Sequence, residues 1–238
     1  MEAIKITNLN KNYKEIKALN NVSLTIYENE LFGLLGVNGA GKTTIIKILT
    51  GLIKKTSGEA YVLSYNVDSQ IDIIKSLIDV SPQEVSIAGN LTVLENLKFF
   101  GEIYDNTSEK TINEVVEMFQ LEEVINQKAK TLSGGWQRRL SIAIAIVSKP
   151  KVLFLDEPTL GLDVLARREL WRVIRKLKKN ITIVLTSHYL EEIEELCDRV
   201  AILSKGNLIT TGTIDEIKMQ AQTNSFEDAF VKIVEEAK

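Results

Sequence analysis

The sequence is poor in cysteine, histidine and proline, with one, one and three of these residues among 238. The single cysteine excludes an internal disulfide and fits a reducing compartment. The 29 basic and 32 acidic side chains nearly balance, so no net field favours nucleic acid or an anionic membrane surface. No apolar run approaches the ~20 residues of a membrane-spanning helix, and residues 1–5 do not have the pattern of a signal peptide. These absences predict a cytoplasmic protein without a nucleic-acid partner.

The most informative stretch that is present fits the phosphate-loop pattern G-x-x-x-x-G-K-[ST]. The apolar run 31–35 before it indicates a buried strand, and residues 44–49 after it indicate a helix. Glycines let successive N–H groups face one anion, and the helix points the positive end of its dipole at that anion. Lys42 adds a full charge at the β- and γ-phosphates, and the Thr43 hydroxyl can bind Mg²⁺. The loop consists of Gly36, Val37, Asn38, Gly39, Ala40, Gly41, Lys42, Thr43 and Thr44.

A second apolar run, residues 151–155, ends in the two carboxylates Asp156 and Glu157. Acidic side chains at the exit of an apolar strand are expected at the carboxyl edge of a parallel sheet, where ligands bind. We predict that Asp156 holds Mg²⁺ through water and that Glu157 reaches a water in line with the γ-phosphate. His188, the single histidine, follows the apolar run 181–185 and is therefore expected at the same edge.

Between these two motifs, Ser133, Gly134 and Gly135 open an amphipathic helix that we expect to continue to Pro150. The N-terminus of such a helix offers free N–H groups to a second anion. One nucleotide hardly needs two such sites from one chain. A head-to-tail pair of chains would use both, with each chain offering its serine to the γ-phosphate held by its partner.

In this order the motifs resemble those of the ATP-binding cassette (ABC) family, and the resemblance covers essentially the whole chain. It identifies the loop as Walker A, residues 132–137 as the signature motif, and residues 156–157 as Walker B with its catalytic glutamate. The implied cofactors are ATP and Mg²⁺, with Lys42, Glu157 and His188 as catalytic residues. The implied Mg²⁺ ligands are Thr43, Gln83 and Asp156.

The same resemblance implies contacts with both nucleotides of a dimer. Tyr13 matches the aromatic residue that stacks on adenine, and Gln83 matches the glutamine that links the Mg²⁺ site to the helical subdomain. Asp163 matches the D-loop aspartate and joins Ser133, Gly134 and Gly135 as residues acting on the partner's ATP. Trp136 departs from the family pattern, in which glutamine is common. It is either an interface anchor or a helix-packing residue.

The remaining pattern predicts an α/β fold, with a P-loop NTPase core on a parallel sheet, an N-terminal antiparallel β-subdomain and an inserted α-helical subdomain. Alternating apolar residues at 4–6 and 22–26 indicate the antiparallel strands, which 61–63 continues. Thr92 and Glu95 form a capping box, Ser108 caps another helix, and residues 205–206 indicate a hairpin. We expect one nucleotide-binding domain over 1–238, with the helical subdomain at about 84–150 and a short helical tail at about 214–238.

Clusters of like charge have a simpler interpretation. Residues 191–195 contain four glutamates, which we interpret as a solvated helix face. The arginine pairs at 138–139 and 167–168 are interpreted as surface or packing residues. None of these clusters requires a nucleic-acid partner.

The resemblance implies the ATPase subunit of a membrane transporter, with separate integral membrane subunits and a second nucleotide-binding subunit. Residues 133–139 and the tail residues 225–230 look most like exporter-type cassettes for drugs, sodium, lipids or polysaccharides. Such a subunit would lie on the inner face of the cell membrane. The alternatives are a soluble ABC ATPase acting on ribosomes or DNA, and a regulator that does not hydrolyse ATP. The cargo, the direction of transport and the choice between homodimer and heterodimer stay open.

Overall fold

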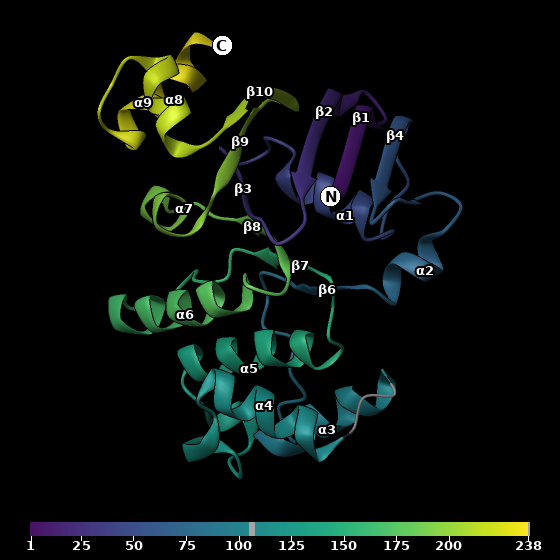
Figure 1. Ribbon diagram of the computed structural model, residues 1–238, viewed down its shortest axis with the longest axis vertical. Coiled ribbons are helices and arrows are strands. Elements are labelled where there is room, and N and C mark those ends of the chain that lie inside the picture. Colours follow the sequence, from purple (N-terminus) through teal and green to yellow (C-terminus); the bar gives the residue numbers. More distant parts are fainter. Residues whose placement is uncertain (105–107, 238) are drawn as a thin grey trace.

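A computed structural model describes residues 1–104 and 108–237, and its two sheets carry the architecture (Figure 1). The first sheet is antiparallel, with strand order β2-β1-β4-β5. Ile4 pairs with Ile26 on one side and with Val62 on the other, which confirms the alternating pattern as antiparallel strands. The strands are β1 (Glu2–Tyr13), β2 (Ile16–Tyr27), β4 (Ser57–Val62) and β5 (Tyr65–Asn66).

The second sheet has the order β10-β9-β3-β8-β7-β6 and is parallel except for β10. The hairpin between β9 and β10 turns at Lys205 and Gly206, whose φ angles of 48° and 80° suit a two-residue turn with both residues left-handed. The strands are β3 (Leu31–Gly36), β6 (Ile78–Ser81), β7 (Val152–Asp156), β8 (Thr182–Thr186), β9 (Arg199–Ser204) and β10 (Asn207–Gly212). The predicted α/β class with a parallel core sheet is therefore confirmed.

The parallel sheet separates two hydrophobic cores because successive side chains of a strand point to opposite faces. In β3, Leu31 and Leu35 belong to the core under the helices, whereas Phe32 and Leu34 belong to the core shared with the antiparallel sheet. Both faces of β3 are buried along its whole length, which explains why the sequence shows a continuous apolar run here.

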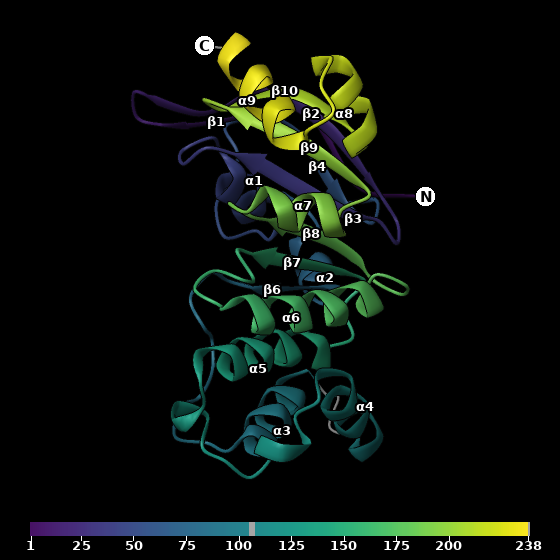
Figure 2. The ribbon, with the colours of Figure 1, turned by 90° about the vertical axis from the view of Figure 1, so that its left-hand side faces the viewer.

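Helices cover the sheet on the side away from β1 and β2, as the two ribbon views show (Figures 1 and 2). Helix α6 lies across the sheet, α5 packs against both β6 and α6, and α3 and α4 form the far end of the molecule. The helices are α1 (Lys42–Leu49), α2 (Ile71–Lys75), α3 (Val93–Ile103), α4 (Glu109–Phe119), α5 (Gly134–Val147), α6 (Val164–Leu177), α7 (Leu190–Leu196), α8 (Ile214–Ala221) and α9 (Phe226–Glu236), with 3-10 turns η1 (Glu122–Val124) and η2 (Ala129–Thr131).

Helix starts follow the sequence signals, whereas some other expectations need correction. The capping box of Thr92 and Glu95 and the cap of Ser108 are confirmed. Helix α5 ends at Val147 rather than Pro150, because Lys149 turns left-handed with φ 52°. Strand β6 was not predicted, since a four-residue strand with an aspartate in it has too weak a pattern. The prediction of a solvated helix face was wrong for Glu192, which is buried. Arg138 and Arg139 are also buried, which agrees with the packing alternative for this pair.

Candidate nucleotide-binding site

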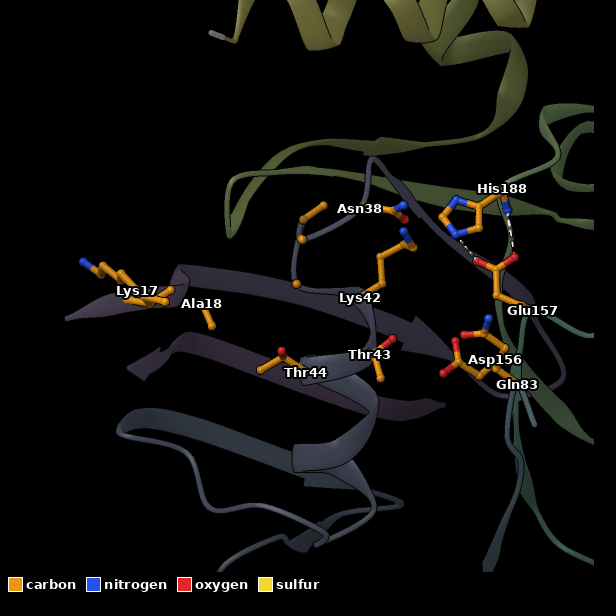
Figure 3. Close-up of a pocket in the computed structure, with 14 residues that line it drawn as sticks. Lys17, Ala18, Asn38, Lys42, Thr43, Thr44, Gln83, Asp156, Glu157 and His188 are labelled. Atoms are coloured by element: carbon orange, nitrogen blue, oxygen red, sulfur yellow. Dashed lines mark hydrogen bonds and ion pairs between the residues drawn. The ribbon is translucent and has the colours of Figure 1, made fainter. Parts of the chain in front are cut away.

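A cavity of about 360 Å³ opens at the carboxyl edge of the parallel sheet, beside the start of α1 (Figure 3). The phosphate-loop residues form one wall, and Gln83 and residues 156–157 lie opposite. Segments far apart in the sequence thus meet at one place, as the strand pattern predicts. The lining residues are Ile16, Lys17, Ala18, Asn38, Gly39, Ala40, Gly41, Lys42, Thr43, Thr44, Gln83, Asp156, Glu157 and His188.

The loop conformation depends on glycine at two points. Gly41, the N-cap of α1, has φ 107°, which is a left-handed conformation that other residues rarely adopt. At Gly36, a Cβ atom would lie 2.4 Å from the carbonyl oxygen of Leu203 in the neighbouring strand. These glycines let the loop turn tightly above α1, in the kind of conformation that can present successive N–H groups to an anion.

Lys42 lies buried within this loop and faces the cavity. Its Nζ donates to the carbonyl oxygen of Gly36 at 2.7 Å. Burial lowers the pKa of Lys42, and the negative charges of Glu157 and Asp156 oppose this shift. The ammonium group is therefore held by neutral carbonyls, near the point where an anion could take their place.

The two predicted carboxylates leave β7 at the opposite wall. Thr186, from the adjacent strand β8, donates its hydroxyl to Asp156 and accepts the N–H of Glu157 at 3.1 Å. Glu157 has φ 52°, an uncommon left-handed backbone for a residue with a side chain. This turn directs the Glu157 carboxylate toward His188 (Figure 3).

Glu157 and His188 are joined by two contacts. The Nε2 atom of His188 lies 3.1 Å from one carboxylate oxygen, and its backbone N–H donates to the other at 3.1 Å. Burial raises the pKa of Glu157 to about 7, although the His188 N–H and Lys42 favour the charged form. Burial, with Lys42 nearby, lowers the pKa of His188. At neutral pH this pair is therefore poised between a charged and a neutral carboxyl group.

The donor set at the cavity suits a hard divalent cation. Thr43, Gln83 and Asp156 all line it and offer a hydroxyl, an amide carbonyl and a carboxylate oxygen. Mg²⁺ in nucleotide sites is held by one or two such oxygens together with phosphates and water. These residues fit Mg²⁺, and among the residues that the structure describes no cluster of His, Cys, Asp or Glu offers an all-protein site.

Other predicted site residues lie outside this cavity. Tyr13 is partly exposed at the end of β1, with the Lys11 ammonium 4.7 Å from its ring centre, and residues 16–18 line the cavity instead. Ser133 and Gly134 are exposed at the start of α5, beside Gly135. Asp163 caps α6 through the N–H groups of residues 165 and 166.

Trp136 shows contacts within its own chain. It packs partly buried against the core under the helices, and the Arg139 guanidinium lies 4.7 Å from the centre of its ring. Helix packing therefore accounts for part of its surface.

Thr186, Arg138 and residues 16–18 belong to the site or its support but are not predicted from the sequence. Thr186 could have been found, because it immediately precedes the Ser187-His188 pair at the end of an apolar strand. Arg138 had no distinguishing signal, since an arginine in an amphipathic helix is usually a surface residue. Residues 16–18 reach the cavity only through the tertiary fold.

Comparisons with known proteins agree with this geometry. The family described as "ABC transporter" matches residues 19–160. "Linearmycin resistance ATP-binding protein LnrL" of Bacillus subtilis (strain 168) is 38% identical over 210 residues, covering 87% of this chain and 68% of LnrL. "Phospholipid-transporting ATPase ABCA3" of Homo sapiens is 40% identical over 217 residues, covering 88% of this chain and 13% of ABCA3.

A solved structure gives the same result for the fold. The "dimeric structure of a post-hydrolysis state of the ATP-binding cassette MJ0796 bound to ADP and Pi" has a TM-score of 0.77 and 28% identity, covering 88% of this chain and 98% of that one. The chain therefore belongs to the ABC transporter family and has the fold of its ATP-binding, ATP-hydrolysing domains. It spans a small fraction of ABCA3 and about two thirds of LnrL.

Proposed function

We propose that this chain binds and hydrolyses MgATP to drive a membrane transporter. The observation that carries the proposal is the meeting of Lys42, Asp156, Glu157 and His188, from three separate segments, around one cavity. Lys42 and the loop N–H groups bind the β- and γ-phosphates, and Thr43, Gln83 and Asp156 hold Mg²⁺, which supplies positive charge at the phosphates when bound. Glu157 orients and polarises the attacking water, and His188 steadies the γ-phosphate.

Catalysis in this arrangement comes from positioning and electrostatics. The Thr186 hydroxyl and the His188 N–H fix Asp156 and Glu157, so little reorganisation is needed when the nucleotide arrives. Nucleotide that neutralises Lys42 would also change the balance of charge around Glu157, because the two groups interact electrostatically.

The second half of the ATP site comes from a partner chain. Ser133 is exposed, and its side chain makes no capping hydrogen bond to α5, whereas Thr92, Ser108 and Thr213 cap their own helices. A Cβ atom at Gly134 would meet no atom within 4 Å, so a ligand can approach the start of α5 closely. This exposed N-terminus suits the γ-phosphate of ATP bound by the other chain. Asp163 caps the neighbouring helix α6, whose Ala166 lies against Gly135. Closure of the dimer on ATP and its reopening after hydrolysis would drive the conformational change of the transporter.

The transporter partner is a separate integral membrane subunit, and the chain lies peripherally on the inner face of the cell membrane. In the parts of the chain that the structure describes, no helix is long and apolar enough to cross a membrane. The names of LnrL and ABCA3 refer to linearmycin resistance and phospholipid transport, which supports a transporter of the exporter type. The family and these relatives give no support to the alternative of an ATPase acting on ribosomes or DNA.

Glu157→Gln tests the proposed function directly. We expect it to bind MgATP as the wild type does, to lose roughly 10²–10⁴-fold in turnover, and to accumulate as a dimer. Binding uses the loop and Asp156, whereas water activation needs the Glu157 charge. Nucleotide titration, ATPase assays and size-exclusion chromatography with MgATP measure these three effects, and Glu191→Gln, at an exposed position of α7, is the control. Wild-type turnover in the Glu157 variant would move the catalytic role elsewhere.

A further inference from the structure

Arg138 is the most fully hydrogen-bonded buried charge near the site. It lies in the second turn of α5, is 3% exposed, and has five N–H donors. Its Nε donates to Pro158 O at 2.8 Å, and its Nη2 donates to the carbonyls of Asp156 and Glu157, both at 2.9 Å. Its Nη1 donates to the carbonyls of Pro82 at 2.5 Å and Gln83 at 3.2 Å.

These five carbonyls belong to two segments that leave the same edge of the sheet. Strands β6 and β7 are neighbours, and their ladder ends where Ser81 pairs with Leu155. Beyond that point, residues 82–83 and 156–158 carry the predicted Mg²⁺ ligands and the catalytic carboxylate. Arg138 bonds to both segments from α5, which packs against β6 and lies across this part of the sheet (Figures 1 and 2).

We propose that Arg138 is a positioning residue that holds Glu157 in its left-handed backbone conformation and couples it to Gln83. This inference rests on the proposed ATPase function. The Glu157 carbonyl is bonded to Arg138 and its N–H to Thr186, so both sides of the strained residue are fixed. Because Ser133 starts the same helix, one side chain connects the signature helix, the Gln83 segment and the catalytic strand end.

Only arginine fits this role. A guanidinium group presents five donors in a rigid planar fork, whereas a lysine ammonium presents three donors from one atom. Lysine at 138 could bond to one of the two segments, and it would leave buried carbonyls of the other without a donor. Burial lowers the pKa of Arg138 to about 10, with Asp156 opposing the shift, so the group is still charged at neutral pH.

Arg138→Lys tests this proposal, with Arg139→Lys as the matched control. Arg139 is the next residue of α5 and is also buried, but it pairs with Glu169 and packs on Trp136 rather than reaching either segment. We expect Arg138→Lys to reduce the ATPase kcat by roughly ten- to hundredfold, as loss of a supporting contact does elsewhere. Its Kd for MgATP should equal that of wild type, because the phosphate loop is untouched. Arg139→Lys should retain wild-type kcat.

Hydrogen exchange without nucleotide provides a second measurement. In Arg138→Lys, amides of residues 83–85 and of 156–160 should exchange faster together, whereas those of 36–44 should not change.

A kcat equal to that of Arg139→Lys, or a loss of MgATP affinity as large as the loss of kcat, would overturn the proposal. Arg138→Gln, which keeps two donors without a charge, replaces the lysine variant if that variant does not fold. If neither variant folds, Arg138 is a general stability residue and the proposal is wrong. A wild-type chain without ATPase activity would instead overturn the proposed function, and hydrogen exchange would still test the link between the two segments.

Discussion

At the scale of single residues, Glu157 combines three unfavourable features. Its carboxyl group is 4% exposed, its backbone is left-handed, and its pKa is raised to about 7 by burial. Such strain is found where surrounding contacts over-determine a conformation, as Thr186, His188 and Arg138 do here. A buried carboxyl group with a raised pKa lowers the stability of the fold at the pH where it is charged.

This cost predicts a pH-dependent stability of Glu157→Gln. Because the pKa is raised from 4.5 to about 7 on folding, the group contributes stability below pH 4.5, and this contribution is lost as the pH rises through 7. Glutamine cannot ionise, so the free energy of unfolding of the variant should rise relative to that of wild type across this pH window. At pH 8 it should exceed the wild-type value by roughly 1–3 kcal/mol. Urea unfolding without nucleotide at pH 5 and pH 8 measures the difference. A difference that is the same at both values would contradict the assigned pKa shift.

At the scale of elements, helix α3 presents apolar side chains to solvent at the far end of the molecule. Phe99 is 48% exposed, and it meets Phe100 edge-on at a ring distance of 5.2 Å. Ile103 is also exposed, whereas Leu94 packs partly against the core. We propose that the segment from Gln83 to Tyr104 contacts the membrane subunit, and Phe99 is a better place to test this than Leu94.

Phe99→Asp should therefore spare the ATPase activity of the isolated chain and release it from its membrane subunit. A charge on the exposed face costs the fold little but disfavours an apolar interface. Co-purification from native membranes measures the association. Val231→Asp is the matched control, since Val231 is 47% exposed on α9 in the helical tail. Detachment by Val231→Asp alone would place the docking surface on the tail.

At the scale of the whole molecule, the two helix starts that are predicted to bind anions lie in different parts of the chain. The start of α1 lines the cavity, whereas the start of α5 does not, and Ser133 there is open to solvent. In the dimer that we propose, one complete ATP site needs the loop of one chain and the signature segment of the other. This composite arrangement can be distinguished from a site completed within one chain.

Purified heterodimers with two different tags make the distinction. In the first, one chain carries Lys42→Ala and the other Ser133→Arg. If Ser133 acts on the partner's ATP, both lesions fall on one site and the other site stays intact. In the second, a wild-type chain is paired with a chain that carries both substitutions, so each site has one lesion. We expect ATPase activity in the first pair and little in the second. The reverse result would show that Ser133 completes the site of its own chain.

The sequence by itself determined the features that are local. The phosphate loop, the carboxylates after an apolar strand, the histidine after another and the helix caps each depend on neighbouring residues, so their patterns are visible in the chain. The meeting of the loop, the carboxylates and the histidine around one cavity could also be predicted, because parallel strands direct their carboxyl ends to one edge of the sheet. The α/β class and the antiparallel N-terminal strands followed from periodicity alone.

The tertiary structure alone decided what depends on distant partners. The sequence left Arg138 as either a surface or a packing residue, and the structure shows it buried by bonding to two strand ends. Glu192 was predicted to be solvated, yet it is buried and accepts the indole N–H of Trp171 at 2.8 Å. Strand β6 forms because β7 supplies its hydrogen-bond partners, and residues 16–18 line the cavity because the antiparallel sheet packs beside α1. A buried polar group must find partners, but the sequence does not show which distant carbonyls will supply them.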